Sequence, residues 1–299
     1  MKSIVKLIRK GYTRTEALYN LALYLSALLE VPFHVAASGR IRDIVELLRA
    51  YAIGLARFVL HGTHLGLDLR KVTLVKSYGK YFVVRRYTVD LNVVSPFSER
   101  LELQKLRHYM GRQRKWCRII FIDVGAHIGK YAIVMADLAD LVVALEPDPR
   151  NYAQLNYNIR LNELDNVKAL NMAASSLRGY CKLRVNRFFT AQSHIDHSLD
   201  GQSYLLVQTD TLDNIVRDLN LYSDDTCFVL KIDVEGHELE VLQGALRVLQ
   251  KTHLLLVETE LNIYKLKKLL KLLPETLKLL QARVYPKTLN LLFVNTIMF

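Results

Sequence analysis

Apolar positions change their spacing along the chain. In residues 3–65 they recur every three or four positions, as at Leu21 and Leu25, which predicts a helical module. From Lys71 to about Val94 the pattern becomes strand-like, with two runs joined at Gly79. This second pattern predicts a β-hairpin.

From Arg118 onward, apolar strands alternate with amphipathic helices. The expected strands are RIIFIDV, LVVALE, VKALNM, FVLKIDV and HLLLVE. A first helix is expected to end at Leu138, and three more are expected over Asn151–Asn162, over about Leu239–Leu249 and from Ile263 to about Leu280. Pro274 should interrupt the last of these. This alternation predicts an α/β fold with a doubly wound, mostly parallel sheet. The closing segments ARVY and LNLLFV predict an antiparallel C-terminal strand pair. We expect three parts: a basic helical module (1–70), a hairpin with a connecting helix (71–117) and a ligand-binding domain (118–299).

The charge is unevenly distributed. Of the net +12, residues 1–120 contribute 22 Lys and Arg against 8 Asp and Glu, while the remainder is nearly neutral. A basic front half fits an anionic partner such as RNA, a phosphorylated lipid or an acidic glycan, and equally fits a surface whose charge serves solubility.

Two further features of composition bear on location. The longest early uncharged run, Ala17–Leu29, is too short to cross a bilayer, so we expect no transmembrane segment and leave peripheral membrane contact open. Cys117, Cys181 and Cys227 are scattered without CxxC spacing, which predicts buried thiols in a reducing compartment and neither a zinc site nor a disulfide framework. Both features indicate a cytoplasmic, or membrane-peripheral, protein.

A glycine-containing turn follows the first strand of the α/β region. It reads Asp123-Val-Gly125-Ala126-His127-Ile-Gly129 and opens a helix, which is where nucleosides bind in open α/β sheets. The spacing is GxxxG rather than the GxGxxG of diphosphate-binding turns. A carboxylate at this strand end suits the cationic amino-acid end of S-adenosylmethionine, and a purely structural turn is the alternative.

The next two strand ends supply further candidates for the same ligand. Glu146 lies 21 positions after Gly125, where an acidic side chain accepts hydrogen bonds from ribose hydroxyls. Its alternative role is to cap the following helix. Ala173, Ala174 and Ser175 follow the third strand and are small enough to border an adenine ring.

Several ionisable residues follow the fourth strand, in the sequence Lys231-Ile-Asp233-Val-Glu235-Gly-His237-Glu238. If the strand continues, Lys231, Asp233 and Glu235 share one side of it. Such a group suits general-base work on a hydroxyl or amine acceptor. A divalent-ion site and simple complementation of a helix dipole are the alternatives.

Other polar residues carry less information. His194 and His197 form HIDH but have no third ligand, so we assign no metal. Thr211 and Asp213 are expected to cap a helix. Glu258 and Glu260 are placed either beside the acceptor or in solvent.

Five motifs in order resemble those of the FkbM-type methyltransferases: FIDVGAHIGKYA, ALEPDPRNYAQLNYNIRLN, QTDTLDNIV, LKIDVEGHELEVLQGA and LVETE. The resemblance implies a class I, Rossmann-like methyltransferase fold with S-adenosyl-L-methionine as the donor. It implies donor-binding roles for Asp123, Gly125, Gly129 and Glu146, and acceptor-side roles for Asp233, Glu235 and His237. It leaves the front module unmatched.

The resulting hypothesis is O-methylation of a hydroxyl on a glycan, lipid-linked sugar or small metabolite. We place Lys231, Asp233, Glu235 and His237 at the reaction centre. The alternatives are an RNA methyltransferase that uses the basic front half, and a non-catalytic nucleoside-binding interaction protein.

Overall fold

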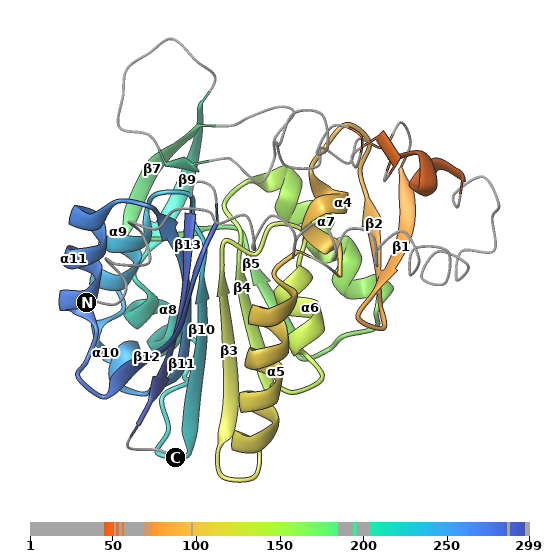
Figure 1. Cartoon of the computed structure of the whole chain (residues 1–299). Coiled ribbons are helices and arrows are strands. Elements are labelled where there is room, and N and C mark those ends of the chain that lie inside the picture. Colours follow the sequence, from red (N-terminus) through yellow and green to blue (C-terminus); the bar gives the residue numbers. More distant parts are fainter. Residues whose placement is uncertain are drawn as a thin grey trace.

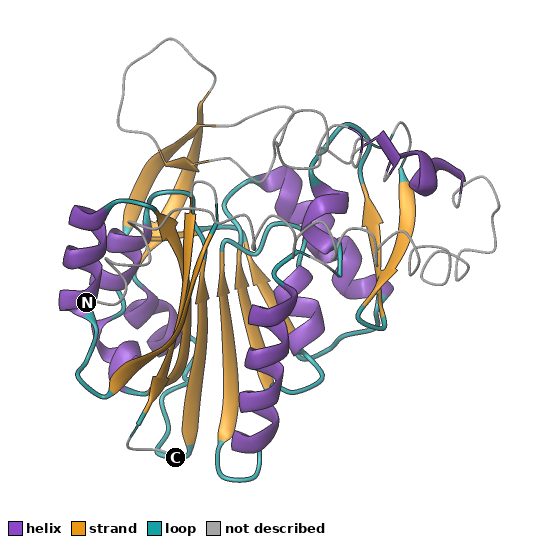
Figure 2. Cartoon of the chain, viewed as in Figure 1, coloured by secondary structure: helices purple, strands orange, loops and turns teal. Residues whose placement is uncertain are grey.

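The computed structural model describes residues 45–50, 52–53, 56, 69, 72–96, 98–184, 194–195, 204–285 and 288–296. These residues form an α/β fold in which one large sheet lies between two groups of helices (Figures 1 and 2). Most of the expected helical module lies outside the described residues, and 45–50 within it is helical. The division into three parts stays a prediction.

The large sheet has seven strands in the order β12-β13-β11-β10-β3-β4-β5. Their bounds are Leu277–Val284 for β12, Thr288–Asn295 for β13, Thr252–Glu260 for β11, Thr226–Ile232 for β10, Arg118–Val124 for β3, Leu141–Leu145 for β4 and Val167–Leu170 for β5. The strands from β11 to β5 are parallel, and β13 is antiparallel to both β11 and β12. The parallel sheet and its antiparallel C-terminal pair are therefore confirmed.

The sheet is apolar because helices cover both of its faces. In β3, Ile119 and Phe121 pack on one side and Ile120 and Ile122 on the other, and all four are fully buried. The first side packs against α5 (Arg100–Gln113), α6 (Lys130–Met135) and α7 (Pro149–Leu161). The second packs against α8 (Leu212–Asp218), α9 (Glu238–Gln243), α10 (Leu246–Gln250) and α11 (Ile263–Leu272).

The predicted hairpin forms, but its second strand is shorter than expected. Strands β1 (Thr73–Ser77) and β2 (Lys80–Val84) pair antiparallel, and the expected strand over 88–94 is wrong, since α4 (Asp90–Val94) lies there. The physical cause is the buried carboxylate of Asp90, which accepts hydrogen bonds from the backbone and the guanidinium of Arg85. This pairing turns the chain away from β2.

Two helix predictions are corrected at their C-terminal parts. The expected helix over Leu239–Leu249 is two helices, because α9 ends at its C-cap Gly244 and glycine is a poor helix former. Only glycine fits there, since a Cβ would lie 2.0 Å from the carbonyl oxygen of Ser175. The expected helix to Leu280 ends at Leu272, just before Pro274, and strand β12 begins at Leu277. Proline lacks the N–H that a helix needs, so the chain leaves the helix there.

A smaller sheet that the sequence did not predict projects beyond the edge of the large one (Figure 1). Its order is β6-β9-β7-β8, with bounds Ala173–Ala174, Tyr204–Asp210, Gly179–Arg184 and His194–Ile195. His194 lies in β8, whereas His197 lies outside the described residues. After β9, Thr211 caps α8 by accepting a hydrogen bond from Asn214, as predicted.

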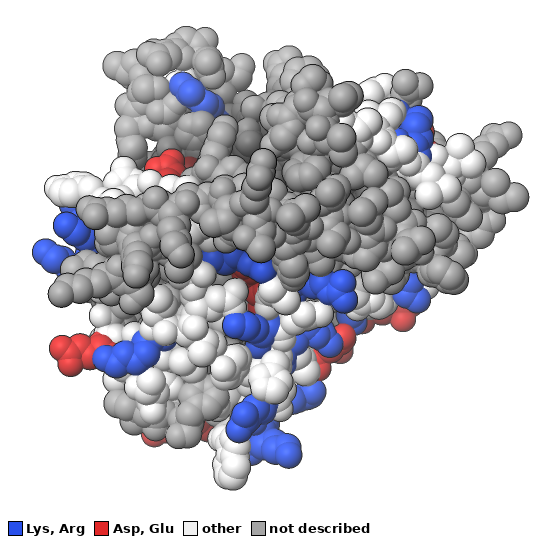
Figure 3. Space-filling view, in the orientation of Figure 1, with Lys and Arg blue, Asp and Glu red and all other residues white. Residues whose placement is uncertain are grey.

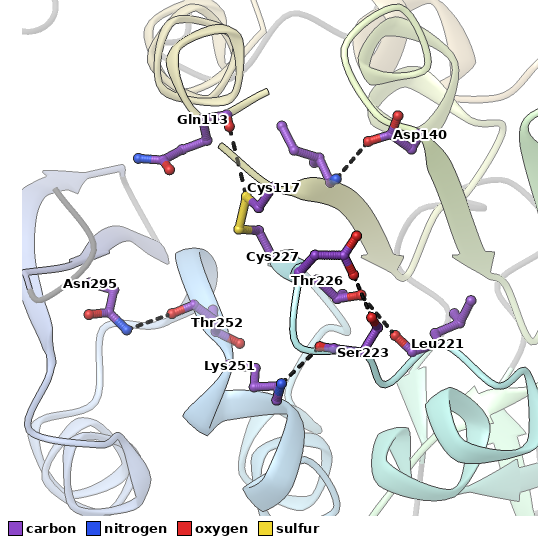
Figure 4. Close-up of a disulfide and its surroundings, with 12 residues drawn as sticks. Gln113, Cys117, Asp140, Leu221, Ser223, Thr226, Cys227, Lys251, Thr252 and Asn295 are labelled. Carbon is purple, nitrogen blue, oxygen red and sulfur yellow. Dashed lines mark hydrogen bonds between the residues drawn. A yellow bond between two sulfur atoms is a disulfide. The ribbon is translucent and has the colours of Figure 1, made fainter. Parts of the chain in front are cut away.

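The cysteine prediction is wrong for two of the three residues. Cys117, just before β3, and Cys227, in β10, form a disulfide at the edge where these strands begin (Figure 4). Cys181 is a free, half-buried thiol, and burial raises its pKa to about 11. Spacing along the chain did not reveal the pair because the two cysteines are 110 residues apart and adjacent strands bring them together.

No helix within the described part of the chain is long and apolar enough to cross a membrane.

Candidate active site

A cavity opens where the parallel strands β3, β4 and β10 end, beside the start of α5. Ten of the residues singled out from the sequence line it: Gly125, Ala126, His127, Glu146, Ala173, Ala174, Lys231, Asp233, Glu235 and His237. Asp123, Gly129 and Ser175 are not in its lining. The strand-end rule thus predicted that these residues gather at one edge of the sheet.

The two glycines of the turn after β3 make room for protein atoms. A Cβ at Gly125 would lie 1.9 Å from the carbonyl oxygen of Asp233, and Gly125 has a positive φ of 79°. A Cβ at Gly129 would lie 2.5 Å from a methyl carbon of Leu155. These glycines therefore allow β10 and α7 to pack closely against the turn, and Gly125 also lines the cavity.

Glu146 stands at the end of β4 and is almost fully buried. Its two carboxylate oxygens accept hydrogen bonds from the backbone N–H groups of His127, at 2.8 Å, and Asp148, at 2.9 Å. Oε1 also accepts a longer hydrogen bond from Nδ2 of Asn151, at 3.4 Å, whereas Oε2 keeps a lone pair for a ligand. Burial raises the pKa of Glu146 to about 7. The geometry fits a ribose hydroxyl at Oε2.

The neighbouring wall of the cavity is apolar. It consists of Leu145, Met172, Ala173, Ala174 and Leu183, which come from β4, β6, β7 and the segment before β6. Apolar walls with few polar groups are what a flat heterocycle needs. This end of the cavity, with its apolar wall beside Glu146, therefore fits a nucleoside.

Lys231 lies deep in the cavity and joins two aspartates. Its Nζ is 3.4 Å from a carboxylate oxygen of Asp123 and 3.4 Å from one of Asp233, and it donates to the carbonyl oxygen of Gly125. Although burial opposes ionisation, the charges of Asp123 and Asp233 raise the pKa of Lys231. Lys231 therefore stays protonated and holds the two aspartates in place.

Asp123 is completely buried and lies beneath the cavity. One carboxylate oxygen accepts a hydrogen bond from the backbone N–H of Ala132, in the first turn of α6, and the other faces Lys231. Burial raises the pKa of Asp123, against the opposing effect of Lys231. The structure places it as a support for Lys231, and not on the wall where a ligand binds.

The turn after β10 carries a strained glutamate. β10 ends at Ile232, so the expected continuation of the strand to Glu235 does not occur, and Glu235 has a positive φ of 48°. Glu235 is exposed as a residue, but the protein atoms around its carboxyl and the negative charges of Asp233 and Glu238 raise its pKa to about 8. A carboxyl with this pKa is suited to accept a proton near neutral pH.

Two neighbours of Glu235 have structural partners. The carboxylate of Glu238 lies 2.6 Å from Nζ of Lys265 and accepts a hydrogen bond from Gly236. His237 precedes α9, lines the cavity and makes a 3.0 Å hydrogen bond between its Nε2 and the hydroxyl of Ser175. Ser175 therefore orients the imidazole and does not itself line the cavity.

The carboxylates at the end of β11, Glu258 and Glu260, lie outside the cavity lining. Glu258 is half-buried, and burial raises its pKa. Glu260 is exposed and lies 3.9 Å from Nζ of Lys265. The sequence left open whether these two carboxylates lie beside the acceptor or in solvent. Exposure to solvent applies to Glu260 alone.

Three residues that the sequence reasoning missed also line the cavity: Glu99, Lys130 and Tyr131. Lys130 is 2% exposed, and its Nζ lies 3.7 Å from a carboxylate oxygen of Glu99. The only sequence signal was the position of Lys130 and Tyr131 directly after the glycine turn. Glu99 precedes α5 and reaches the site only through the tertiary fold.

Comparison with known proteins agrees with this geometry. A family model described as the methyltransferase FkbM domain matches residues 123–286, more than half of the chain. The hexuronic acid methyltransferase AglP of Haloferax volcanii is 29% identical over 141 residues, which cover 47% of this chain. The match spans 56% of that relative.

The solved structures that resemble this fold have low sequence identity to the chain. Trm5b from Pyrococcus abyssi is 14% identical, with a TM-score of 0.40 over 77% of this chain and 58% of that one. The tRNA m1G37 methyltransferase of M. jannaschii is 16% identical, with a TM-score of 0.39 over 84% of this chain and 68% of that one. At these scores the likeness carries no functional argument.

The family match covers the glycine turn after β3, Glu146 and the residues from Lys231 to His237. These are the residues that the structure gathers around the cavity. The methyl donor of such a domain is S-adenosylmethionine, and the apolar wall and Glu146 fit its nucleoside. The chain belongs to the FkbM methyltransferase family.

Proposed function

We propose that this chain is an O-methyltransferase that transfers the methyl group of S-adenosylmethionine to a hydroxyl of a glycan, lipid-linked sugar or small metabolite. The observation that carries the proposal is the arrangement around the cavity. Glu146 and an apolar wall lie toward one end, and Asp233, Glu235 and His237 lie beside them on the turn after β10. A nucleoside site thus borders a group of proton acceptors.

The donor, when bound, supplies a methyl group already activated by its positive sulfur. The protein must therefore orient the acceptor oxygen and take its proton, and orientation alone contributes about 7–11 kcal/mol in well-aligned reactions. We assign the proton to the carboxylate of Glu235, because its pKa of about 8 is the best matched to this task. Asp233, held by Lys231, orients the acceptor.

His237 is a positioning residue in this proposal. Its Nε2 is engaged with the Ser175 hydroxyl, and its Nδ1 lies 3.5 Å from the carboxylate of Glu240. An imidazole bound on both sides is held in one orientation. It therefore shapes the acceptor side of the cavity and fixes the turn that carries Glu235.

A sugar acceptor is supported by the relative named for hexuronic acid methylation. The carboxylate of Asp233 faces the cavity and favours an uncharged hydroxyl at the reacting position, so the carboxylate of a hexuronic acid would have to lie away from Asp233. These two points together favour a sugar hydroxyl. The test therefore compares different sources of the sugar: free, lipid-linked or part of a larger glycan.

The RNA alternative draws on the positive charge of the chain. Among described residues, Arg112, Arg114, Lys115 and Arg118 are exposed around Trp116, which is 82% exposed. Figure 3 shows Lys and Arg side chains gathered on the face that contains α5. These residues lie near the start of β3, whereas the cavity lies at its end. The basic residues of 1–44 lie outside the described residues.

The test is transfer of labelled methyl from S-adenosylmethionine to separate acceptor pools: neutral sugars, uronic acids, a lipid-linked glycan fraction and RNA. The proposal expects label in a sugar-containing pool, as an ether stable to mild base. Glu235→Gln should abolish it and Lys168→Met, an exposed residue outside the cavity, should not. Label in RNA alone would establish the second function, and donor binding without transfer to any pool would favour a non-catalytic binding protein.

A further inference from the structure

One end of the cavity is lined by charged side chains, in contrast to the apolar wall beside Glu146. Ser98 and Glu99, in the segment just before α5, form one side of it, and Lys130 and Tyr131, at the start of α6, form the other. Lys130 donates a hydrogen bond to the carbonyl oxygen of Ser98 and lies 3.7 Å from Glu99. One buried cation and one partly buried anion therefore face the same cavity.

Burial of this pair is unfavourable unless something offsets it. Burial lowers the pKa of Lys130 and raises that of Glu99, so neither charge is well solvated where it lies. A buried ion pair often contributes little to stability, because desolvation cancels the mutual attraction. Such a pair at the wall of a ligand cavity is more readily explained by a ligand that carries the complementary charges.

S-adenosylmethionine carries such charges. Beyond its nucleoside it ends in an amino acid, with a carboxylate and an ammonium on the same carbon. The sequence assigned this end to Asp123, but Asp123 lies beneath the cavity and pairs with Lys231. Glu99 is an anion and Lys130 a cation, and both reach the cavity wall. The 3.7 Å between Nζ of Lys130 and a carboxylate oxygen of Glu99 is similar to the span of an amino-acid zwitterion.

We infer that Lys130 binds the carboxylate and Glu99 the ammonium of the donor's methionyl group. The inference rests on the donor assignment of the proposed function and deepens it. It places the nucleoside against Glu146 and the apolar wall, and the amino acid between α5 and α6. The reacting sulfur then lies between these two ends.

The ring of Tyr131 holds this arrangement in place. Its centroid is 5.7 Å from Nζ of Lys130 and 5.5 Å from Nζ of Lys231, within the range of cation–π attraction. The Tyr131 hydroxyl is buried and has no hydrogen-bond partner among the described residues, so it offers a further donor near the same end. One aromatic side chain thus contacts both buried lysines.

Glu99 lies before the part of the chain that the family model matches, which begins at residue 123. The donor pocket is therefore completed by a segment outside that region. This explains why the sequence motifs alone did not reveal the amino-acid end of the site.

The experiment is calorimetric titration of the full chain with two ligands. S-adenosylhomocysteine carries the amino acid, whereas 5′-methylthioadenosine keeps the adenine, ribose and sulfur and lacks it. The variants are Lys130→Met, Lys130→Arg and Glu99→Gln, with Lys168→Met as the matched control at an exposed lysine outside the cavity. Binding of methylthioadenosine reports whether each variant keeps a folded nucleoside site.

We expect Lys130→Met to weaken S-adenosylhomocysteine binding by roughly 10- to 100-fold, the range for loss of a charge-assisted hydrogen bond. Methylthioadenosine affinity should change less than about twofold, Lys130→Arg should recover part of the loss, and Glu99→Gln should show the same ligand selectivity.

Two results would overturn the inference: equal losses for both ligands, which would make Lys130 a support of the fold, or unchanged S-adenosylhomocysteine affinity. A wild-type chain that binds neither ligand would instead overturn the donor assignment itself.

Discussion

The carbonyl oxygen of Asp233 lies 1.9 Å from the point that a Cβ on Gly125 would occupy. The turn after β3 and the end of β10 are therefore in backbone contact at the floor of the cavity. Lys231 reinforces this contact, since its Nζ donates to the carbonyl oxygen of Gly125 and lies beside Asp233. The turn after β3 and the turn after β10 are thus held against each other by backbone packing and by Lys231.

Substitution of Gly125 tests this contact. Gly125→Ala should lower the free energy of unfolding by about 3 kcal/mol or more, because a backbone oxygen cannot move as a side chain can. Gly79→Ala is the matched control. Gly79 has a similar φ of 81° but no atom within 4 Å of its Cβ position, so only the backbone penalty of about 1–2 kcal/mol applies. Equal losses in denaturant unfolding would show that the overlap with Asp233 relaxes freely.

Donor binding should depend on pH through Glu146. Burial raises its pKa to about 7, and the ionised carboxylate is acceptor-only, which favours a hydrogen bond from a ribose hydroxyl. Affinity for S-adenosylhomocysteine should therefore rise as pH rises toward about 7 and level off above it. Glu146→Gln should weaken binding and remove this dependence. Calorimetry across this pH range checks both predictions. If the pH dependence persists in Glu146→Gln, another ionisable group causes it.

The same shift has a consequence for stability. The folded-state pKa of Glu146 lies above its ordinary value of 4.5, so the folded chain binds the proton more tightly than the unfolded chain does. This contribution to stability is present below pH 4.5 and is lost as pH rises to about 7. Glu146→Gln should flatten that part of the pH profile of unfolding. An unchanged profile would contradict the shift.

Glu235 combines backbone strain with the proposed chemistry. Its φ of 48° is a conformation that asparagine and glycine adopt more easily than glutamate. Glu235→Asn should therefore raise the free energy of unfolding by a few tenths to about 1 kcal/mol while abolishing methyl transfer. In the wild-type chain the rate should rise with pH through about 8, as the carboxyl loses its proton. An active Glu235→Asn variant would remove Glu235 from the proton path.

Much of this architecture follows from local pattern. The strands β3, β4, β10 and β11 are continuous apolar runs, and the candidate residues at their ends, such as Glu146 and Asp233, were found because parallel strands end at one edge. What local pattern cannot show is contact between distant segments. Glu99 meets Lys130 only when α5 and α6 pack together, and the role of Asp123 depended on how deeply β3 is buried.

Two errors in secondary structure have the same origin. The residues of α4 read as a strand because they are apolar, and the turn that makes them helical depends on the Arg85–Asp90 pairing. The start of β12 read as helix because the leucine spacing of α11 continues through Leu277. In both cases a tertiary contact or a proline overrode the periodicity.

The buried pair of Asp123 and Lys231 should be costly to break. Lys231→Met leaves the carboxylate of Asp123 buried without its cation, and removal of one partner from such a pair typically costs about 3–5 kcal/mol. The double variant Asp123→Asn with Lys231→Met should recover part of this loss, since no buried charge remains. Thermal unfolding of the single and double variants checks the coupling, and strictly additive losses would show that the two side chains act independently.

The disulfide at the other edge of the sheet should stabilise the fold without touching the chemistry. Cys117 and Cys227 close a loop of 110 residues, and a bridge over so long a loop contributes roughly 2–5 kcal/mol by restricting the unfolded chain. Cys117→Ser with Cys227→Ser, or treatment with a thiol reductant, should lower the unfolding midpoint while leaving S-adenosylhomocysteine affinity unchanged, because the cavity lies at the far end of β3 and β10. Cys181→Ser, which removes the free thiol, is the control and should leave both quantities unchanged. Equal midpoints in oxidised and reduced wild-type protein would show that the bridge does not form in solution.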